Sequence, residues 1–413
     1  MSDANAFDVL KERGFIKQAT NEQAIREKFA TEKITAYVGF DPTAESLHIG
    51  NLLCIMALAH LQRQGHRPIA IIGDGTGMIG DPSGKTEMRK MLPREVIAKN
   101  AEKIKAQIGR YFKIDGKAGL AVHNADWLLE LNYVDFLRNI GRHFSVNRML
   151  SAEAYKIRLE TGLSFLEFNY QILQAYDFLK LYQDYNCTMQ LGGDDQWGNI
   201  LSGVDLVRRV EGAEVYCLTW PLLTTADGRK MGKTAEGAVW LDAEKTSPYK
   251  YYQFWINVDD RDVLKYLTYY TFLTMDEIRK LGNLEGADIR SAKQVLAYEA
   301  TKITHGESAA LQAQKASESA FGNTDEASLS GVPSFTVELK KMKEGVSVVN
   351  LFTESGLTSS KSDARRLIQQ GGAYINQERV VGIEDRIYED DFENGSLMLR
   401  AGKKRYLRIL LEI

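Results

Sequence analysis

The chain has few cysteines and no long apolar run. Its 413 residues include three cysteines, Cys54, Cys187 and Cys217, which are scattered and lack C-x-x-C spacing. This set of thiols indicates neither a disulfide framework nor a zinc site, and it fits a reducing cytoplasm. No apolar stretch approaches the ~20 residues that span a bilayer, and the N-terminus lacks a basic segment followed by an apolar one. We therefore expect a cytoplasmic protein with no membrane partner and no targeting segment.

The chain also lacks a strong charge of either sign. It has 52 basic and 55 acidic residues, for a net charge of −3. This balance argues against binding of nucleic acid through bulk positive charge, so any RNA contact has to be a local patch. Hydrophobic content of 44% and charged content of 26% are ordinary for a globular protein, and a length of 413 residues predicts two or three domains.

One stretch combines a strand, a turn and a helix start. Residues 36–40 are apolar and rich in strand formers, and Asp41-Pro42-Thr43 ends this run with turn chemistry. A helical pattern begins near His48, so that Gly50 and Asn51 lie in its first turn. A helix N-terminus offers unpaired N–H groups, and glycine allows a ligand to approach the backbone. These residues predict a nucleotide cradle, although a histidine that only caps the helix is an equal alternative when His48 is considered alone.

A glycine-rich segment follows the next apolar run, and two phosphate motifs almost fit it. The series Gly75-x-Gly77-x-x-Gly80 matches the dinucleotide fingerprint, yet Asp81-Pro82 follows where a helix should open. A P-loop would need glycine at position 79, where Ile79 stands, ahead of Gly84-Lys85-Thr86. We therefore expect a mobile active-site loop that belongs to neither class.

Short apolar runs alternate with helical patterns through about residue 220. Candidate strands lie at residues 36–40, 68–72, 119–123, 188–191 and 214–218, with helical patterns over 1–33, 93–112 and 125–185. This alternation predicts an α/β catalytic domain with a Rossmann-like parallel sheet, whose ligands bind at the carboxyl ends of the strands.

Three further segments carry polar groups suited to ligands. Tyr170, Gln174 and Asp177 are spaced so that they share one helical face, for which an amphipathic surface helix is the simpler explanation. The segment Gly192-Gly193-Asp194-Asp195-Gln196 follows a strand and can hold hydroxyl or carboxylate groups. The segment Lys230-Met-Gly-Lys233-Thr234 places two lysines on a glycine-containing loop, which suits a polyphosphate.

These motifs together resemble those of one enzyme family. GFDPTAESLHIGN is similar to the HIGH signature of class I aminoacyl-tRNA synthetases, and KMGKT is similar to their KMSKS loop. GGDDQWGNI and FNYQILQAYDF resemble tyrosine-site motifs of bacterial-type tyrosyl-tRNA synthetases. The resemblance implies an enzyme that activates tyrosine with ATP, releasing pyrophosphate, and transfers it to the 3′-terminal ribose of tRNA(Tyr). It also implies Mg²⁺ accompanying ATP, no tightly bound cofactor or dedicated metal site, and a homodimer formed through a helical insert at about residues 125–165.

The resemblance assigns tyrosine-binding roles to six residues. Tyr37 and Asp177 match the positions that bind the phenol hydroxyl, and Gln196 matches the carboxylate side. The positions that bind the α-ammonium are Asp81, Tyr170 and Gln174.

Adenylate formation needs stabilisation of negative charge more than it needs a base, because the tyrosine carboxylate is already a nucleophile. The family positions for this catalysis are Thr43, His48, Lys85, Arg89, Lys230, Lys233 and Thr234. The positions that surround ATP are Asp41, Gly50, Asn51, Gly193, Asp195 and Lys233. The chain departs from the family pattern at Asn51, where HIGH has its second histidine, and at Val38, where many relatives carry cysteine. Neither change removes a group that the chemistry requires.

The remaining chain is expected to bind RNA. After the catalytic domain at residues 1–225, residues 226–322 comprise the KMSKS-like loop and an aromatic-rich helical domain, which the family uses for the anticodon. Aromatic side chains at helical spacing are expected mostly in the core of that domain. A linker is predicted at residues 323–347, where a Ser/Gly/Asp-containing stretch begins.

Residues 348–413 resemble the small α+β S4 RNA-binding domain. Ser359 is expected to cap a helix, Gly371-Gly372 to end it, and a hairpin to follow. Its RNA-binding face would carry Lys361, Arg365 and Arg366, with Lys403, Lys404 and Arg405 as further candidates. A solvated helix face is the alternative explanation of these charges.

Two other functions stay open at this point. A tryptophanyl-tRNA synthetase would share the fold, but its pocket should not offer the hydroxyl-binding pair Tyr37 and Asp177. A noncatalytic RNA-binding protein could retain a synthetase shape, but it would have no need of His48, Lys230 and Lys233.

Overall fold

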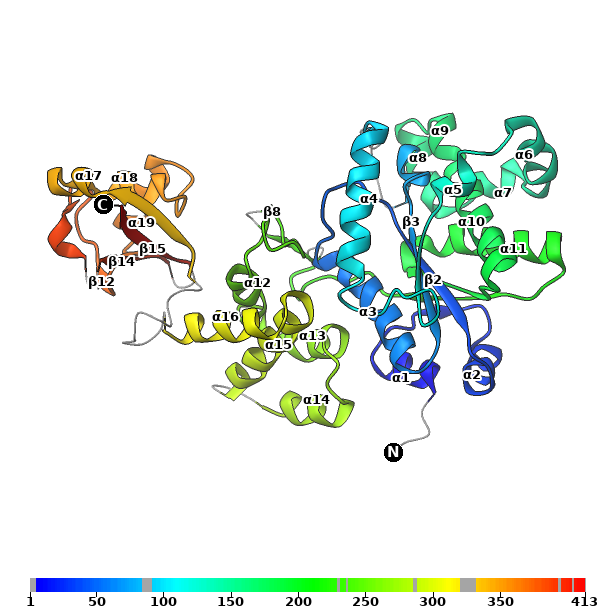
Figure 1. Cartoon of the computed structure of the whole chain (residues 1–413), viewed down its shortest axis with the longest axis horizontal. Coiled ribbons are helices and arrows are strands. Elements are labelled where there is room, and N and C mark those ends of the chain that lie inside the picture. The colour runs from blue at the N-terminus through cyan, green and yellow to red at the C-terminus, as the bar shows by residue number, and fades with distance from the viewer. Residues whose placement is uncertain are drawn as a thin grey trace. The chain divides into compact units, whose positions relative to one another are not determined.

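The structure is a computed structural model in which the chain forms two compact units (Figure 1). The first unit comprises residues 1–245 and 259–284, and the second comprises residues 246–258 and 285–413. The residues that the structure describes are 5–83, 91–228, 231–234, 237–284, 288–319, 332–392, 395–402 and 405–412.

A six-stranded sheet forms the centre of the first unit, with the strand order β1-β6-β5-β2-β3-β4. All neighbouring pairs from β6 to β4 are parallel, whereas β1 pairs antiparallel with β6. The strands are β1 (Gln18–Ala19), β2 (Thr35–Phe40), β3 (Arg67–Ile72), β4 (Leu120–His123), β5 (Met189–Gly193) and β6 (Tyr216–Trp220). The predicted parallel sheet is therefore confirmed.

The N-terminal segment corrects one prediction. Residues 1–33 were expected to be helical throughout, but β1 separates α1 (Ala6–Glu12) from α2 (Glu22–Thr31). A two-residue edge strand leaves no apolar run in the sequence, because its place depends on hydrogen bonds with β6 rather than on its own side chains.

Helices connect the parallel strands and cover the sheet. Helices α3 (Ile49–Arg63) and α4 (Arg94–Ile108) pack against β3 (Figure 1), and α11 (Trp197–Glu211) packs against β5 and β6. Helix α10 (Tyr170–Tyr185) packs along α11. Strands β3 and β6 are almost wholly buried, as expected for a sheet with helices on its faces.

Five short helices form the insert between β4 and α10. They are α5 (Ala125–Leu128), α6 (Tyr133–Asn139), α7 (Val146–Leu150), α8 (Glu153–Thr161) and α9 (Phe165–Phe168). A buried ion pair fastens α8 to α9, with Arg158 Nε 3.1 Å from Glu167 Oε1 and Nη2 3.1 Å from Oε2. Glu167 also completes a capping box with Ser164, so this carboxylate serves two helices at once.

The first unit ends with a small hairpin and two helices. The hairpin consists of β7 (Lys233–Thr234) and β8 (Gly237–Ala238), and the helices are α13 (Val263–Tyr270) and α14 (Met275–Gly282). Arg13, at the end of α1, donates to the carbonyls of Thr268, Thr271 and Leu273 at the end of α13. Burial lowers the pKa of this guanidinium to about 10. A cation at a helix C-terminus satisfies carbonyls that have no partner within the helix.

The second unit begins with α12 (Pro248–Ile256), α15 (Ile289–His305) and α16 (Glu307–Ser319), which pack together. The side chains of Tyr251, Tyr252 and Trp255 are fully buried on α12. This confirms the expectation that aromatic residues at helical spacing form the core here.

A five-stranded sheet with the order β12-β11-β14-β15-β9 forms the rest of the second unit. The strands are β9 (Ser334–Glu338), β11 (Ala373–Ile375), β12 (Glu378–Arg379), β14 (Ser396–Ala401) and β15 (Arg405–Glu412). The helices are α17 (Leu339–Glu344), α18 (Val348–Glu354) and α19 (Lys361–Gln369), and a separate pair of strands consists of β10 (Val346–Ser347) and β13 (Arg386–Ile387). Residues 334–347, which the sequence places in a linker, thus form β9, α17 and β10; residues 320–331 lie outside the described part of the chain.

The predicted cap of α19 is wrong by one residue. Ser360 is the N-cap, and its Oγ accepts from the N–H of Asp363 at 3.2 Å. Ser359 instead donates its N–H and Oγ to the Asp363 carboxylate. The predicted hairpin is confirmed: β11 and β12 pair across Asn376 and Gln377, which both have positive φ, as a tight two-residue turn requires.

Candidate active site

The start of α3 is fixed by a reciprocal cap. His48 Nδ1 accepts from the N–H of Gly50 at 2.9 Å, and Asn51 Oδ1 accepts from the N–H of His48 at 3.1 Å. A Cβ at Gly50 would lie 2.6 Å from His48 Cε1, so only glycine lets the imidazole fold over the helix start. Asn51, at the second-histidine position of HIGH, therefore holds the turn that presents His48.

The KMGKT segment lies against this helix start. The N–H of Ile49 donates to Val239 O, and the N–H of Val239 donates to Gly232 O, both at 3.0 Å. Gly232 has φ +85°, and a Cβ there would lie 2.9 Å from the nitrogen of Gly50. The structure therefore brings together two motifs that are about 180 residues apart in the sequence. Lys230 lies outside the described residues, and so do the side chains of Lys233 and Thr234, whose backbone forms β7.

Asp41, directly after β2, accepts hydrogen bonds from two other segments of the candidate site. Its Oδ2 accepts from the hydroxyl of Tyr170 at 3.0 Å, and its Oδ1 accepts from Thr76 Oγ1 at 2.9 Å. Asp41 was predicted beside the nucleotide and Tyr170 beside the tyrosine ammonium. Their hydrogen bond shows that these two side chains are in direct contact.

Asp177 is held by two side chains that the sequence did not single out. Trp127 Nε1 donates to its Oδ1 at 2.7 Å, and Asn124 Nδ2 donates to its Oδ2 at 3.0 Å. Asn124 also donates to Thr76 Oγ1 and accepts from the N–H of Gly75. Burial raises the pKa of Asp177 to about 7, although the two donors oppose that shift. Asn124 directly follows β4, so the rule that ligands bind at the carboxyl ends of strands could have identified it.

Tyr37 points its hydroxyl into the protein, where no described atom pairs with it. Its side chain is 1% exposed and packs edge-on against Phe178, and its hydroxyl makes no hydrogen bond within the described part of the chain. Burial, followed by the nearby charge of Asp177, raises the pKa of Tyr37. Gln190, its neighbour on β5, likewise has a buried and unpaired Oε1 among the described atoms. Buried polar atoms without partners are costly, and they suggest a site arranged for a polar ligand.

The other predicted tyrosine-binding residues are also linked. Gln196 Nε2 donates to Asp81 Oδ2 at 2.8 Å, while Asn199 Nδ2 donates to Gln196 Oε1 at 3.1 Å. Asp81 Oδ1 accepts from the N–H of Ser83, which fixes the turn that carries this carboxylate. Gln174 is half-buried, one helical turn beyond Tyr170 on α10.

The remaining predicted residues are more exposed or lie outside the described chain. Asp195 is exposed beside Gly193, where a Cβ would lie 2.6 Å from Asp195 Oδ1. Thr43 is exposed on the turn after β2, and residues 84–90, including Lys85 and Arg89, are not described.

The predicted RNA-binding residues lie on α19. Lys361, Arg365 and Arg366 are exposed there, and Arg366 pairs with Asp363 at 2.7 Å. Arg405 donates to the carbonyl of Leu357, whereas residues 403–404 lie outside the described chain.

Two other kinds of feature are absent from the described part of the chain. No helix there is long and apolar enough to cross a membrane. No group of three or more histidine, cysteine, aspartate or glutamate side chains there could hold a metal ion.

Comparison with known proteins decides the family. Residues 29–322 match the family model of the class I tRNA synthetases (W and Y), and residues 325–409 match that of the tyrosine–tRNA ligase SYY-like C-terminal domain. The tyrosine–tRNA ligase of Clostridium tetani is 56% identical over 408 residues, which cover 99% of each chain. The chain belongs to the tyrosine–tRNA ligase family. Members of this family are class I aminoacyl-tRNA synthetases, so the predicted family, fold class and enzyme activity are confirmed.

Solved structures agree with this assignment. A C-terminally truncated mitochondrial tyrosyl-tRNA synthetase from Aspergillus nidulans has a TM-score of 0.69 and 29% identity, covering 77% of this chain and 94% of that one. The tyrosyl-tRNA synthetase of Archaeoglobus fulgidus, solved with L-tyrosine, has a TM-score of 0.57 and 18% identity, covering 75% of this chain and 100% of that one. The latter shows the shared synthetase fold alone.

Proposed function

We propose that this tyrosine–tRNA ligase binds its amino acid between Asp177 and Tyr37 at one end and Asp81 and Gln196 at the other. The observation that carries the proposal is the buried pair at the first end. Asp177 offers a carboxylate held by two donors, and Tyr37 offers a hydroxyl that has no partner in the described chain. A phenol hydroxyl can donate to the first and accept from the second.

This arrangement explains selection of tyrosine. Phenylalanine would leave the buried Tyr37 hydroxyl without a partner in the complex and would give Asp177 no hydrogen bond in addition to those from Trp127 and Asn124. At the other end, Asp81 with Tyr170 and Gln174 receives the ammonium, and Gln196 holds the carboxylate side. The hydrogen bond from Gln196 to Asp81 keeps these two groups next to each other before the ligand binds.

In the first step, the tyrosine carboxylate attacks the α-phosphorus of ATP, the bond to the bridging oxygen breaks, and pyrophosphate leaves. His48 contributes a hydrogen-bond donor, because acceptance at Nδ1 places the proton of a neutral imidazole on Nε2. Further stabilisation of the phosphate charge comes from Thr43, Lys85, Arg89, Lys230, Lys233 and Thr234. The nucleotide lies along Asp41, Gly50, Asn51, Gly193 and Asp195, where α3 begins and β5 ends.

Mg²⁺ would accompany ATP and would be held mainly by the phosphates of the nucleotide. In the second step, a ribose hydroxyl at the 3′ end of tRNA(Tyr) attacks the tyrosyl carbonyl and loses its proton, and AMP leaves. During this step, Lys361, Arg365 and Arg366 on α19 contact the backbone of the bound tRNA.

The enzyme works in the cytoplasm as a homodimer formed through the helical insert. Large apolar side chains are exposed on α6, α7 and α9, including Tyr133 at 61% and Phe165 at 71%. A second copy of the chain would cover this face. Sedimentation at micromolar concentration tests the proposal, with Val134→Glu expected to give monomers and Leu311→Glu, an exposed position on α16, as the control.

Tyrosine-dependent exchange of labelled pyrophosphate into ATP tests the catalytic assignment. Exchange with tyrosine, none with phenylalanine or tryptophan, and a sharp loss in Lys233→Ala are expected. The second candidate is a noncatalytic RNA-binding protein with a synthetase shape, which the S4-like domain would favour. A folded protein that binds tRNA but gives no exchange with any amino acid would contradict the enzymatic proposal and support this candidate.

A further inference from the structure

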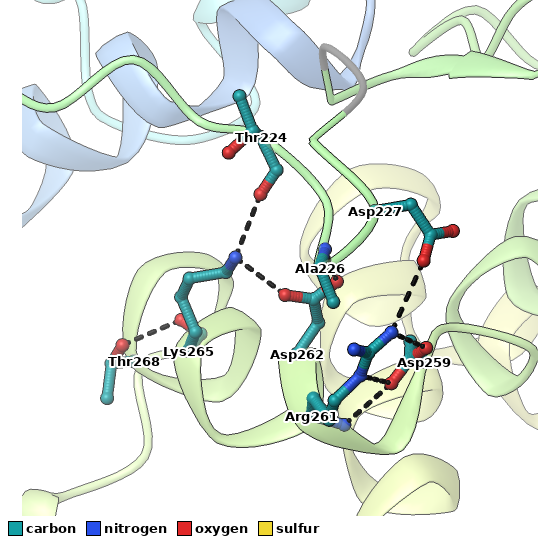
Figure 2. Close-up of polar contacts among 8 residues, drawn as sticks. All are labelled: Thr224, Ala226, Asp227, Asp259, Arg261, Asp262, Lys265 and Thr268. Atoms are coloured by element: carbon teal, nitrogen blue, oxygen red, sulfur yellow. Dashed lines mark hydrogen bonds and ion pairs between the residues drawn. The ribbon is translucent and has the colours of Figure 1, made fainter.

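The segment that leads into KMGKT is held by the start of α13. Lys265 Nζ donates to the carbonyl of Thr224 at 2.9 Å, and Asp262 Oδ2 accepts from the N–H of Ala226 at 2.8 Å (Figure 2). Both contacts are made to the backbone, so they fix the path of the chain whatever side chains it carries. They lie four to six residues ahead of Lys230.

Asp262 and Lys265 also hold each other. Asp262 is 3% exposed, and its Oδ1 lies 2.6 Å from Lys265 Nζ. The carboxylate is thereby satisfied by one backbone N–H and one ammonium, and loss of either partner would leave a buried charge short of a contact. Figure 2 shows both side chains pointing at the Thr224–Ala226 segment.

A second, more exposed tether lies beside this pair. Arg261 donates to both carboxylate oxygens of Asp259, at 2.9 and 2.8 Å, and to Asp227 Oδ1 at 3.2 Å (Figure 2). Ion pairs at such an exposed site are weak, so this tether adds orientation rather than strength.

The element that carries these side chains is itself fixed. Arg13 donates hydrogen bonds to carbonyls at the other end of α13, and Thr268 Oγ1 donates to Lys265 O at 2.7 Å. The far side of the loop is closed by a hydrogen bond from the N–H of Met231 to Leu223 O at 3.1 Å. The described residues that flank Lys230 in the sequence are thus held by α13 on one side and by the hydrogen bond between Met231 and Leu223 on the other.

We propose that Asp262 and Lys265 are positioning residues for adenylation, which set where the KMGKT lysines meet the phosphates of ATP. The inference rests on the proposed role of that loop. Their hydrogen bonds and ion pair in the described chain involve none of the candidate tyrosine-binding residues, so they act through the loop and on the ATP step alone. Misplacing a catalytic group by about 1 Å can cost up to about 100-fold in rate, which makes a tether of this kind measurable.

Pyrophosphate exchange at varied ATP concentration tests the inference with Lys265→Met and Asp262→Asn. We expect kcat/KM for ATP to fall about 10- to 100-fold, while the equilibrium dissociation constant of tyrosine, measured without ATP, stays unchanged. Arg279→Gln is the matched control, because the ion pairs of Arg279 with Asp276 and Glu12 in the described chain are exposed. It should behave as the wild type.

Combination with Lys230→Ala separates positioning from general damage. If Asp262 acts through the loop lysine, Asp262→Asn should cost much less in the Lys230→Ala background than in the wild type. Full additivity would overturn the proposal, as would normal ATP dependence in both tether variants, or an equal loss of tyrosine binding. If Asp262→Asn does not fold, Lys265→Met and Arg261→Gln carry the same test. Absence of exchange in the wild type would contradict the proposed function instead, so the two failures are distinguishable.

Discussion

Replacing Tyr37 by phenylalanine should move the stability of the free protein and its affinity for tyrosine in opposite directions. The Tyr37 hydroxyl is buried and has no hydrogen-bond partner in the described chain. Folding therefore removes it from water without compensation, and the proposed ligand supplies the missing partner. Tyr37→Phe deletes the hydroxyl oxygen, which lowers the stability of the free protein and contributes a hydrogen bond to the complex with tyrosine.

The two magnitudes follow from general values for buried hydroxyls. Leaving such a group unpaired costs about 1–3 kcal/mol, so the free variant should be more stable by up to that amount. For a unit of this size, about 1 kcal/mol shifts Tm by about 2–4 °C. A hydrogen bond contributes about 0.5–1.5 kcal/mol net, which corresponds to tyrosine binding that is about two- to tenfold weaker.

Thermal unfolding with and without tyrosine measures both effects, and titration calorimetry gives the dissociation constants of tyrosine and phenylalanine. Discrimination between the two amino acids should narrow in the variant. Tyr252→Phe is a matched control, because its hydroxyl is also buried and unpaired in the described chain but lies on α12 in the second unit. It should raise stability without changing tyrosine affinity.

Three results would refute this reasoning. A lower Tm for free Tyr37→Phe would mean that the hydroxyl has a stabilising partner. An unchanged affinity for tyrosine would remove Tyr37 from the binding site. Equal weakening for phenylalanine would point to a packing change rather than a lost hydrogen bond.

Three further predictions concern charge. Burial raises the pKa of Asp177 to about 7, and its ionised form should accept a hydrogen bond from the ligand. The affinity for tyrosine should therefore fall about tenfold between pH 8 and pH 6. An affinity that calorimetry finds unchanged over this range would contradict the prediction. Glu167→Gln should leave the buried Arg158 charge unpaired and cost about 3–5 kcal/mol, read as a lower urea midpoint, whereas an unchanged midpoint would show that the ion pair contributes little. The hydrogen bond that the protonated His123 ring donates to the Asp74 carboxylate raises the pKa of His123. This pair therefore stabilises the fold fully below pH 6.5 and loses the effect as pH rises through the folded pKa. Urea unfolding of Asp74→Asn should accordingly differ from the wild type more at pH 6 than at pH 9, and equal differences at both pH values would speak against the linkage.

The strands were predictable because a sheet buried on both faces needs continuous apolar runs, and such runs stand out in the sequence. β1 was missed since two residues at a sheet edge carry no pattern of their own. The cap of α19 was misplaced because Ser359 and Ser360 are chemically identical candidates, and only the backbone path decides between them.

The candidate site was predictable where its residues lie in one motif and less so where they come from several. The turn of His48, Gly50 and Asn51 is local, so the sequence describes it well. The two donors to Asp177 come from positions 50 and 53 residues away, and no spacing rule connects them. Their selection depends on how β4 and α10 meet, which is a property of the folded chain.

The order of the chain through the two units has a consequence during synthesis. The first unit needs residues 259–284, which follow a segment that belongs to the second unit. Arg13 leaves the ribosome early, yet the carbonyls that it binds appear only at residues 268–273. At about 5–20 residues per second, the 39 residues after position 245 take roughly 2–8 s to translate. For that interval the nascent chain exposes the surface that α13 later covers, so this is when a chaperone would be needed most.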